Sequence, residues 1–248
     1  MHGNTGIVAH WSDVEKNPNG DGAVGLVREH LKRTYRGRYP GCMHAVTDYV
    51  TGRSVLDIGV VAHSREFIDS PEWKHREIKR VASRSVGCDI LPDEVAYLQS
   101  LGFDVRLVDA TSSTDLGERF ETAYIGDVIE HVNDPIKLMQ FAAKHLASNG
   151  QIVVVTPCPF WWKNLVRCLS ERPLMMNVDH LDWITPFNAV EIGHRASLEL
   201  VGWHLVQDLG HNRLRRFAHH IRDAVGLGHS ELFSWGYVFI YARPQLHR

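Results

Sequence analysis

Apolar residues in this chain gather in short runs, and the runs alternate with longer amphipathic stretches. Runs rich in Val and Ile and bounded by turn residues are typical of strands that are buried on both faces of a parallel sheet. Strand ends are marked by Gly, Pro, Asn and Asp. The runs predict seven strands, at residues 54–58, 85–88, 105–108, 123–125, 151–156, 204–207 and 237–241.

The stretches between these runs repeat apolar residues every three to four positions, which is the period of a helix. They predict helices at about 23–35, 71–83, 92–101, 135–146 and 186–202. Ser70-Pro71 and Thr185-Pro186 each place an N-cap residue before a proline at the first helical position, and Gly202 is expected to end the last helix. Alternating strands and helices predict an α/β fold with helices on both faces of the sheet and the last strand antiparallel.

Length and composition limit the class of protein further. The chain has 248 residues, of which 44% are hydrophobic, enough for one large domain with a full core. A net charge of -2 argues against a generally basic nucleic-acid binder. No apolar run approaches the roughly 20 residues of a membrane span, and the N-terminus lacks a signal-peptide pattern. Four scattered cysteines are typical of the reduced thiols of a cytoplasmic protein, and we expect that location. From the charge and the apolar runs we expect no binding to nucleic acid or to a membrane.

Candidate chemistry lies where the predicted strands end. Asp57 comes at the end of the first strand, Asp89 at the end of the second, Asp109 after the third, and Asp127 after the fourth. In open α/β sheets, ligands bind beyond the carboxyl ends of the strands. A carboxylate at the second strand end suits the two hydroxyls of a ribose. Sixteen histidines show no HExxH motif or similarly spaced pair, so no metal site is expected.

These motifs together resemble the class I S-adenosylmethionine-dependent methyltransferases, in the broad group that includes the ubiquinone-type small-molecule O-methyltransferases. The resemblance covers about residues 50–208. It implies a Rossmann-like seven-stranded sheet within a methyltransferase domain at 51–248, preceded by a helical segment at 1–50. The motifs that carry it are VLDIG (55–59), GCDI (87–90), Asp109-Ala110, GDVIEHVNDP (126–135), LASNGQIVVVTP (146–157) and HLDWITP (180–186).

The resemblance also implies a cofactor, S-adenosylmethionine, and a role for each strand end. Gly59 would pass under the methionine portion, Asp89 would bind the ribose hydroxyls and Asp109 the adenine amino group. The remaining implied contacts are Ile90 and Ala110 against adenine and Asp127 and Val128 near the sulfonium. The complete set of expected cofactor-binding residues is Asp57, Gly59, His63, Asp89, Ile90, Asp109, Ala110, Asp127 and Val128.

Two histidines are the candidates for catalysis. If the acceptor is a hydroxyl, a base must remove its proton, and histidine titrates in the useful pH range. His131 is preferred to His180 because its segment starts at a strand end. The proline-broken aromatic stretch at 157–185 is expected to form a lid over the substrate pocket. The expected acceptor is a small molecule or a glycan.

Each of these residues also has a purely structural interpretation. Asp57 could bond loop amides, Asp89 could serve a helix N-terminus, and Asp109 could belong to an ordinary turn. Glu130-His131 could end a strand and cap the next helix, and His180 could lie on the surface. The aromatic stretch could pack against a sheet edge. The basic cluster Arg213–Arg216 fits a solvated face better than an anion site.

The chain departs from the family in the loop after the first strand. The usual Gly-x-Gly-x-Gly is absent, because Val61 and His63 occupy the second and third glycine positions. Valine at positive φ would be strained, so a longer loop is expected before the next helix. Either Lys74 or His75 could turn back to the cofactor carboxylate. The missing glycines leave a second hypothesis, a non-catalytic binding or scaffold protein; a nicotinamide enzyme is disfavoured because Gly-x-Gly-x-x-Gly is absent.

Overall fold

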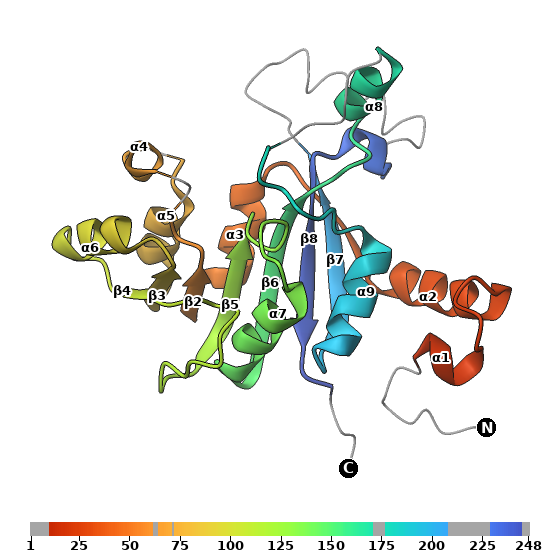
Figure 1. Ribbon diagram of the computed structural model, residues 1–248, viewed down its shortest axis with the longest axis horizontal. Helices are drawn as coiled ribbons and strands as arrows, with labels where there is room; N and C mark the ends of the chain where they lie inside the picture. The colour runs from red at the N-terminus through yellow and green to blue at the C-terminus, as the bar shows by residue number, and fades with distance from the viewer. Residues whose placement is uncertain (1–9, 62–63, 71, 171–176, 208–228, 245–248) are drawn as a thin grey trace.

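Eight strands form one mixed sheet in the computed structural model, which describes residues 10–61, 64–70, 72–170, 177–207 and 229–244 (Figure 1). The strand order is β1-β7-β8-β6-β5-β2-β3-β4. β8 runs antiparallel to both of its neighbours, β6 and β7, and the other neighbouring strands pair in parallel. The strands are β1 (Tyr35–Tyr39), β2 (Ser54–Ile58), β3 (Arg84–Asp89), β4 (Val105–Leu107), β5 (Phe120–Gly126), β6 (Leu146–Pro157), β7 (Glu199–Val206) and β8 (Gly236–Ala242).

Seven of these strands correspond to the seven predicted runs, and the antiparallel last strand is confirmed. The eighth, β1, was not predicted. It pairs in parallel with the outer side of β7, with Tyr35 opposite Trp203. Its sequence, YRGRY, lacks an apolar run because β1 is an edge strand whose residues are all partly or fully exposed.

Helices cover both faces of the sheet, as predicted (Figure 1). Successive strand residues face opposite sides: Leu56 packs in the cluster with Met139 of α7, whereas Val55 packs in the cluster with Val46 of α3. α9 shares the α7 face, and α5 shares the α3 face. The helices are α1 (Trp11–Val14), α2 (Asp21–Thr34), α3 (Cys42–Val50), α4 (Arg65–Ile68), α5 (Lys74–Val81), α6 (Pro92–Ser100), α7 (Pro135–Lys144), α8 (Trp162–Leu169) and α9 (Pro186–Arg195), with a 3₁₀ turn at Glu231–Phe233.

The helix predicted at 186–202 starts as expected but ends early. Thr185 and Asn188 form a reciprocal capping box, and Pro186 occupies the first turn. The prediction that Gly202 ends the helix is wrong, because α9 stops at Arg195 and Gly202 lies inside β7. In β7 partly exposed and buried residues alternate from Glu199 to His204, a period of two that a strand produces and a helix does not.

The helix start predicted at Ser70-Pro71 is also displaced. α5 begins at Lys74 with Trp73 as its N-cap residue, and Pro71 lies outside the described residues. Trp73 is buried, and its indole N–H donates to the carbonyl of Val60, 2.8 Å away. Trp73 itself has an extended backbone, so α5 starts only after it.

Two sequence features lie outside the described residues, namely His63 and the basic cluster Arg213–Arg216. Among the helices that the structure describes, none has the length and apolar character needed to cross a membrane.

Candidate functional site

A pocket of about 620 Å³ lies at the carboxyl ends of β2, β3, β4 and β5. The strand order reverses between β2 and β5, and in doubly wound sheets ligands bind at such a switch point. The volume is within the usual range for small-molecule sites. Gly59, Asp89, Asp109 and Asp127, from four different strand ends, all line this pocket.

Gly59 lies at a crowded point of the pocket floor. Its φ of 79° is in the left-handed region that favours glycine. A Cβ atom built on it would lie 2.3 Å from Cγ2 of Val128, which follows β5. The Gly59 N–H also donates to the carbonyl of Cys88, 2.8 Å away. Backbone conformation and space therefore both exclude a side chain at residue 59.

Asp57 is paired with a histidine rather than with loop amides. Its Oδ2 lies 2.7 Å from Nδ1 of His75, and the two residues are 3% and 1% exposed. This contact joins β2 to α5, and both residues line the pocket. His75 is therefore directed to Asp57, and the contact of Lys74 or His75 with a cofactor carboxylate stays a prediction.

Lys74 forms an ion pair with Asp127 on the pocket wall. Burial is the largest single effect and lowers the pKa of Lys74, but the charge of Asp127, the charges of Cys42 and Asp57 and the hydrogen bond to Asp127 together outweigh it, and the pKa is raised. Asp127 has a φ of 56°, which is unusual for a residue other than glycine and is stored strain of the kind found at functional sites. A cation and an anion thus face the pocket together, close to Gly59.

Asp89 holds the loop that lacks the expected glycines. The carboxylate is 7% exposed and accepts hydrogen bonds from the N–H groups of Val61, Ile90 and Leu91 at 2.8, 2.8 and 3.2 Å. Burial raises its pKa. A carboxylate has about four acceptor positions, so about one remains for a ligand. The Val61 amide explains how the loop stays close to β3 without the second and third glycines.

The adenine-side residues line the same pocket. Asp109 is exposed, and its Oδ1 accepts from both the N–H and the hydroxyl of Thr111 at 2.7 Å, which lowers the pKa of Asp109. Ile90 is 63% exposed, unusual for an isoleucine, and Ala110 is nearly buried. All three residues line the pocket, so Ile90 presents an apolar surface to it. Asp109 therefore belongs to a turn with Thr111, which is the purely structural role considered for it from the sequence.

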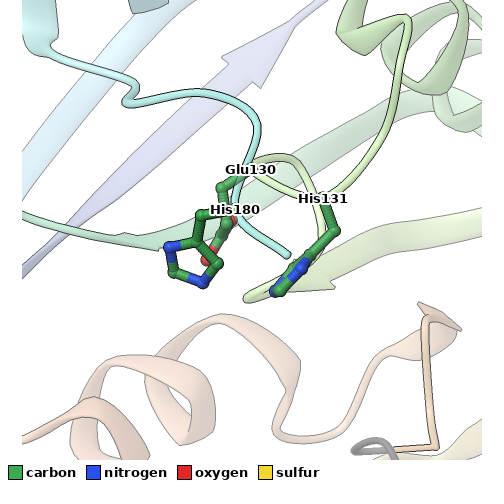
Figure 2. A group of neighbouring side chains, drawn as sticks. All are labelled: Glu130, His131 and His180. Atoms are coloured by element: carbon green, nitrogen blue, oxygen red, sulfur yellow. The ribbon is translucent and has the colours of Figure 1, made fainter. Parts of the chain in front are cut away.

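Glu130, His131 and His180 form a cluster beside the pocket. Figure 2 shows their side chains pointing from two neighbouring loops into one shared space. The rings of His131 and His180 are edge-to-face with centroids 4.5 Å apart. The amides of Leu181 and Asp182 donate to the carbonyl oxygen of Glu130 at 2.8 and 3.3 Å, so the backbone locks the two loops together.

Glu130 is the most deeply buried member of this cluster, at 1% exposure. The hydroxyl of Thr156 donates to its Oε2 over 3.1 Å. Burial, and then the nearby charge of Asp127, raises the pKa of Glu130 to about 8. His131 lines the pocket together with Asp179, whose Oδ2 lies 3.2 Å from Nδ1 of His131. Sequence reasoning missed this Asp179 contact and the Thr156 contact, since nothing in the spacing links those positions.

The segment expected to be a lid contains α8, which lies beyond the carboxyl ends of the central strands (Figure 1). Its apolar residues recur at helical spacing and are exposed, namely Trp162, Leu165, Val166 and Leu169. Among the described residues of this segment, Asp179 lines the pocket. The lid role stays a prediction.

Comparisons with known proteins agree on the fold. A family described as "Methyltransferase domain" matches residues 50–223. No relative is found among curated proteins. A chain of the Haloferax volcanii complex that contains the Trm112 methyltransferase activator is 14% identical and has a TM-score of 0.55, over 90% of this chain and 93% of that one.

Two further solved structures are similar. A SAM-dependent methyltransferase from Archaeoglobus fulgidus is 18% identical with a TM-score of 0.50, over 88% of this chain and 98% of that one. The [4+2]-cyclase SpnF is 14% identical with a TM-score of 0.52, over 93% of this chain and 85% of that one. At such identities the structural likeness shows the fold alone, and a cyclase among the similar structures illustrates why.

Proposed function

The chain belongs to the methyltransferase domain family, and we propose that it transfers a methyl group from S-adenosylmethionine to a hydroxyl of a small molecule or glycan. The observation that carries the proposal is the set of polar groups around Gly59. At the switch point of the sheet, one pocket contains a glycine floor, a Lys74–Asp127 ion pair and a carboxylate at the end of β3.

The methionine portion of the cofactor fits the ion pair. It carries an ammonium and a carboxylate on one carbon, a zwitterion whose charges complement Asp127 and Lys74. We assign the carboxylate to Lys74 and the ammonium to Asp127, each as a charge-assisted hydrogen bond. The methionine portion of the cofactor would pass over Gly59, where a protein side chain would fill the space.

The nucleoside portion fits the next two strand ends. The one acceptor position left on Asp89 serves one ribose hydroxyl, in place of the two expected from sequence. The exposed side chain of Ile90 packs on the adenine face, and Asp109 accepts from the adenine amino group beside Ala110. His63 lies outside the described residues, and its expected proximity to the cofactor stays a prediction.

The acceptor side is formed by His131 and His180. A sulfonium methyl group is already activated, so alignment with the attacking oxygen is the main requirement. His131 lines the pocket, and Asp179 beside its Nδ1 orients the ring, as expected of a base in this position. His180 packs edge-to-face against His131 and helps to fix its ring.

A second candidate function is a binding protein that has kept the fold without the reaction. The hydrogen bond from Val61 to Asp89 favours it, because that carboxylate already serves the loop. The two functions differ in a simple way, since only the methyltransferase needs to bind S-adenosylmethionine.

Calorimetric titration with S-adenosylmethionine and S-adenosylhomocysteine tests the cofactor assignment. We expect Lys74→Met to weaken both ligands about 10- to 100-fold, the loss expected for one hydrogen bond to a charged group. Lys79→Met is the matched control, because Lys79 lies on the same helix but is exposed and bonds the carbonyl of Gly102. If the wild type binds neither ligand at millimolar concentration, the methyltransferase hypothesis is overturned. If Lys74→Met and Lys79→Met weaken binding equally, the assignment of Lys74 to the cofactor carboxylate is overturned.

The acceptor assignment needs a separate experiment. Transfer of a labelled methyl group is measured with matched sets of phenols, sugars and amines. We expect the label on hydroxyl compounds, and loss of transfer in His131→Ala with unchanged affinity for S-adenosylhomocysteine. Labelling of amines alone would refute a hydroxyl acceptor.

A further inference from the structure

Two imidazoles and one carboxylate meet at the acceptor side of the pocket, in the cluster of Glu130, His131 and His180. One ligand atom from each residue lies within 4.8 Å of the other two. Two histidines and one carboxylate on one side of a cation leave further coordination positions open, a donor set that binds first-row divalent cations. The cluster therefore has the composition and the size of a metal site.

The carboxylate of Glu130 has one oxygen available for a cation. Thr156 fixes Oε2, and no residue that the structure describes donates a hydrogen bond to the buried Oε1. A buried carboxylate oxygen that receives no hydrogen bond is costly. A cation at the centre of the cluster would remove that cost.

The surroundings of the two histidines also match those of metal ligands. Metal-binding histidines commonly place their other ring nitrogen against a carboxylate, which fixes the tautomer and strengthens the ligand. Asp179 lies 3.2 Å from Nδ1 of His131, within ion-pair distance, so we assign Nε2 of His131 to the cation. His180 is held next to Glu130 by the hydrogen bonds that Leu181 and Asp182 donate.

The local charge favours a cation as well. Asp179 and Asp127 lie near the cluster, and Lys74, whose charge also reaches Glu130, is already paired with Asp127. A divalent cation bound here would take the ionised form of Glu130 and would lie beside Asp179.

We propose that Glu130, His131 and His180 bind one divalent first-row cation, such as Mn²⁺, Co²⁺ or Zn²⁺, and that its open positions bind the acceptor oxygen. The second half rests on the proposed methyltransferase function. Coordination lowers the pKa of the acceptor hydroxyl, so its proton passes to water. The oxygen then forms the new O–CH₃ bond, while the S–CH₃ bond breaks and its electron pair stays on sulfur. In this arrangement His131 is a ligand in place of the direct base.

Metal binding is measured on the full chain after treatment with a chelator. Mn²⁺, Co²⁺, Zn²⁺ and Mg²⁺ are titrated separately by calorimetry, and Co²⁺ is also followed by its visible absorption. We expect one ion per chain, with Mg²⁺ weakest because it prefers oxygen ligands. His180→Ala and Glu130→Gln should each weaken binding at least 30-fold, whereas His44→Ala, at an exposed histidine of α3, should leave it unchanged.

Asp179→Asn provides a test that does not disturb the core, because Asp179 is exposed. It should weaken the ion about tenfold. Circular dichroism and the affinity for S-adenosylhomocysteine show whether each variant is folded. Failure of the wild type to bind any of the four ions would overturn the site, as would affinities unchanged in His180→Ala and Asp179→Asn.

The metal proposal and the methyltransferase proposal fail separately. If the wild type binds S-adenosylhomocysteine normally but binds none of the four ions, the metal site alone is overturned. Ion binding without cofactor binding overturns the enzyme alone. Methyl transfer that is equally fast with and without chelator would overturn the role of the ion in activating the acceptor.

Discussion

Replacing Gly59 by alanine places a methyl group where the structure leaves no room for one. Two independent costs follow. The φ of 79° is unfavourable for any residue with a Cβ, by about 1–2 kcal/mol. The new methyl would also lie 2.3 Å from Cγ2 of Val128, and crowding of this kind costs about 1–3 kcal/mol. We therefore expect Gly59→Ala to lower the free energy of unfolding by about 2–5 kcal/mol.

A matched glycine separates the two costs. Gly102 has nearly the same φ, 80°, but nothing lies within 4 Å of the position that an added methyl group would take. Gly102→Ala should therefore cost only the backbone term, about 1–2 kcal/mol. Val128→Ala supplies the second control, because it removes both Cγ atoms and leaves Cβ at an ordinary contact distance of 3.5 Å. In that background Gly59→Ala should cost about as much as Gly102→Ala.

Urea unfolding followed by circular dichroism gives these free energies, and the double-mutant cycle gives the coupling between residues 59 and 128. We expect a coupling of about 1–3 kcal/mol, the full cost of the crowding. A coupling near zero, or equal costs for Gly59→Ala and Gly102→Ala, would refute the close approach of β2 and the β5 loop that defines the pocket floor.

Two further predictions concern buried histidines. His75→Ala leaves the Asp57 carboxylate buried without its partner, so the free energy of unfolding should fall by about 1–3 kcal/mol or more in urea unfolding; no change would contradict the buried pair. Burial, and then Arg36, lowers the pKa of His204 from 6.5 to about 4. Because the unfolded chain binds this proton first, stability should be full above pH 6.5 and fall by about 2–3 kcal/mol as the pH drops towards 4. His204→Phe should flatten that fall, and an unchanged slope would rule out the residue as its source.

The sequence was most informative where burial alone decides the structure. Continuous Val and Ile runs such as 151–156 have no alternative to a strand buried on both faces, and they predicted the sheet correctly. The pattern was ambiguous at 196–202, where apolar spacing fits both a helix and a strand. It was silent for β1, because an edge strand needs no apolar run.

The site was predictable only in part, for a related reason. Strand ends converge whenever the sheet is parallel, so Asp89 and Asp109 could be placed at the pocket from sequence. Side-chain pairings between distant segments carry no local signal. The contact of Asp57 with His75 and the approach of His180 to Glu130 depend on how two loops pack, which residue spacing does not report.

The position of β8 sets the order in which the molecule is completed during synthesis. Among the strands that the structure describes, β1 and β7 connect to the other five only through β8, which leaves the ribosome after those seven. Until then the nascent chain holds two separate pieces of sheet, and β6 presents an open edge. A stop codon placed before residue 236 should therefore leave β1 and β7 detached from the rest of the sheet, however well the cofactor half has folded.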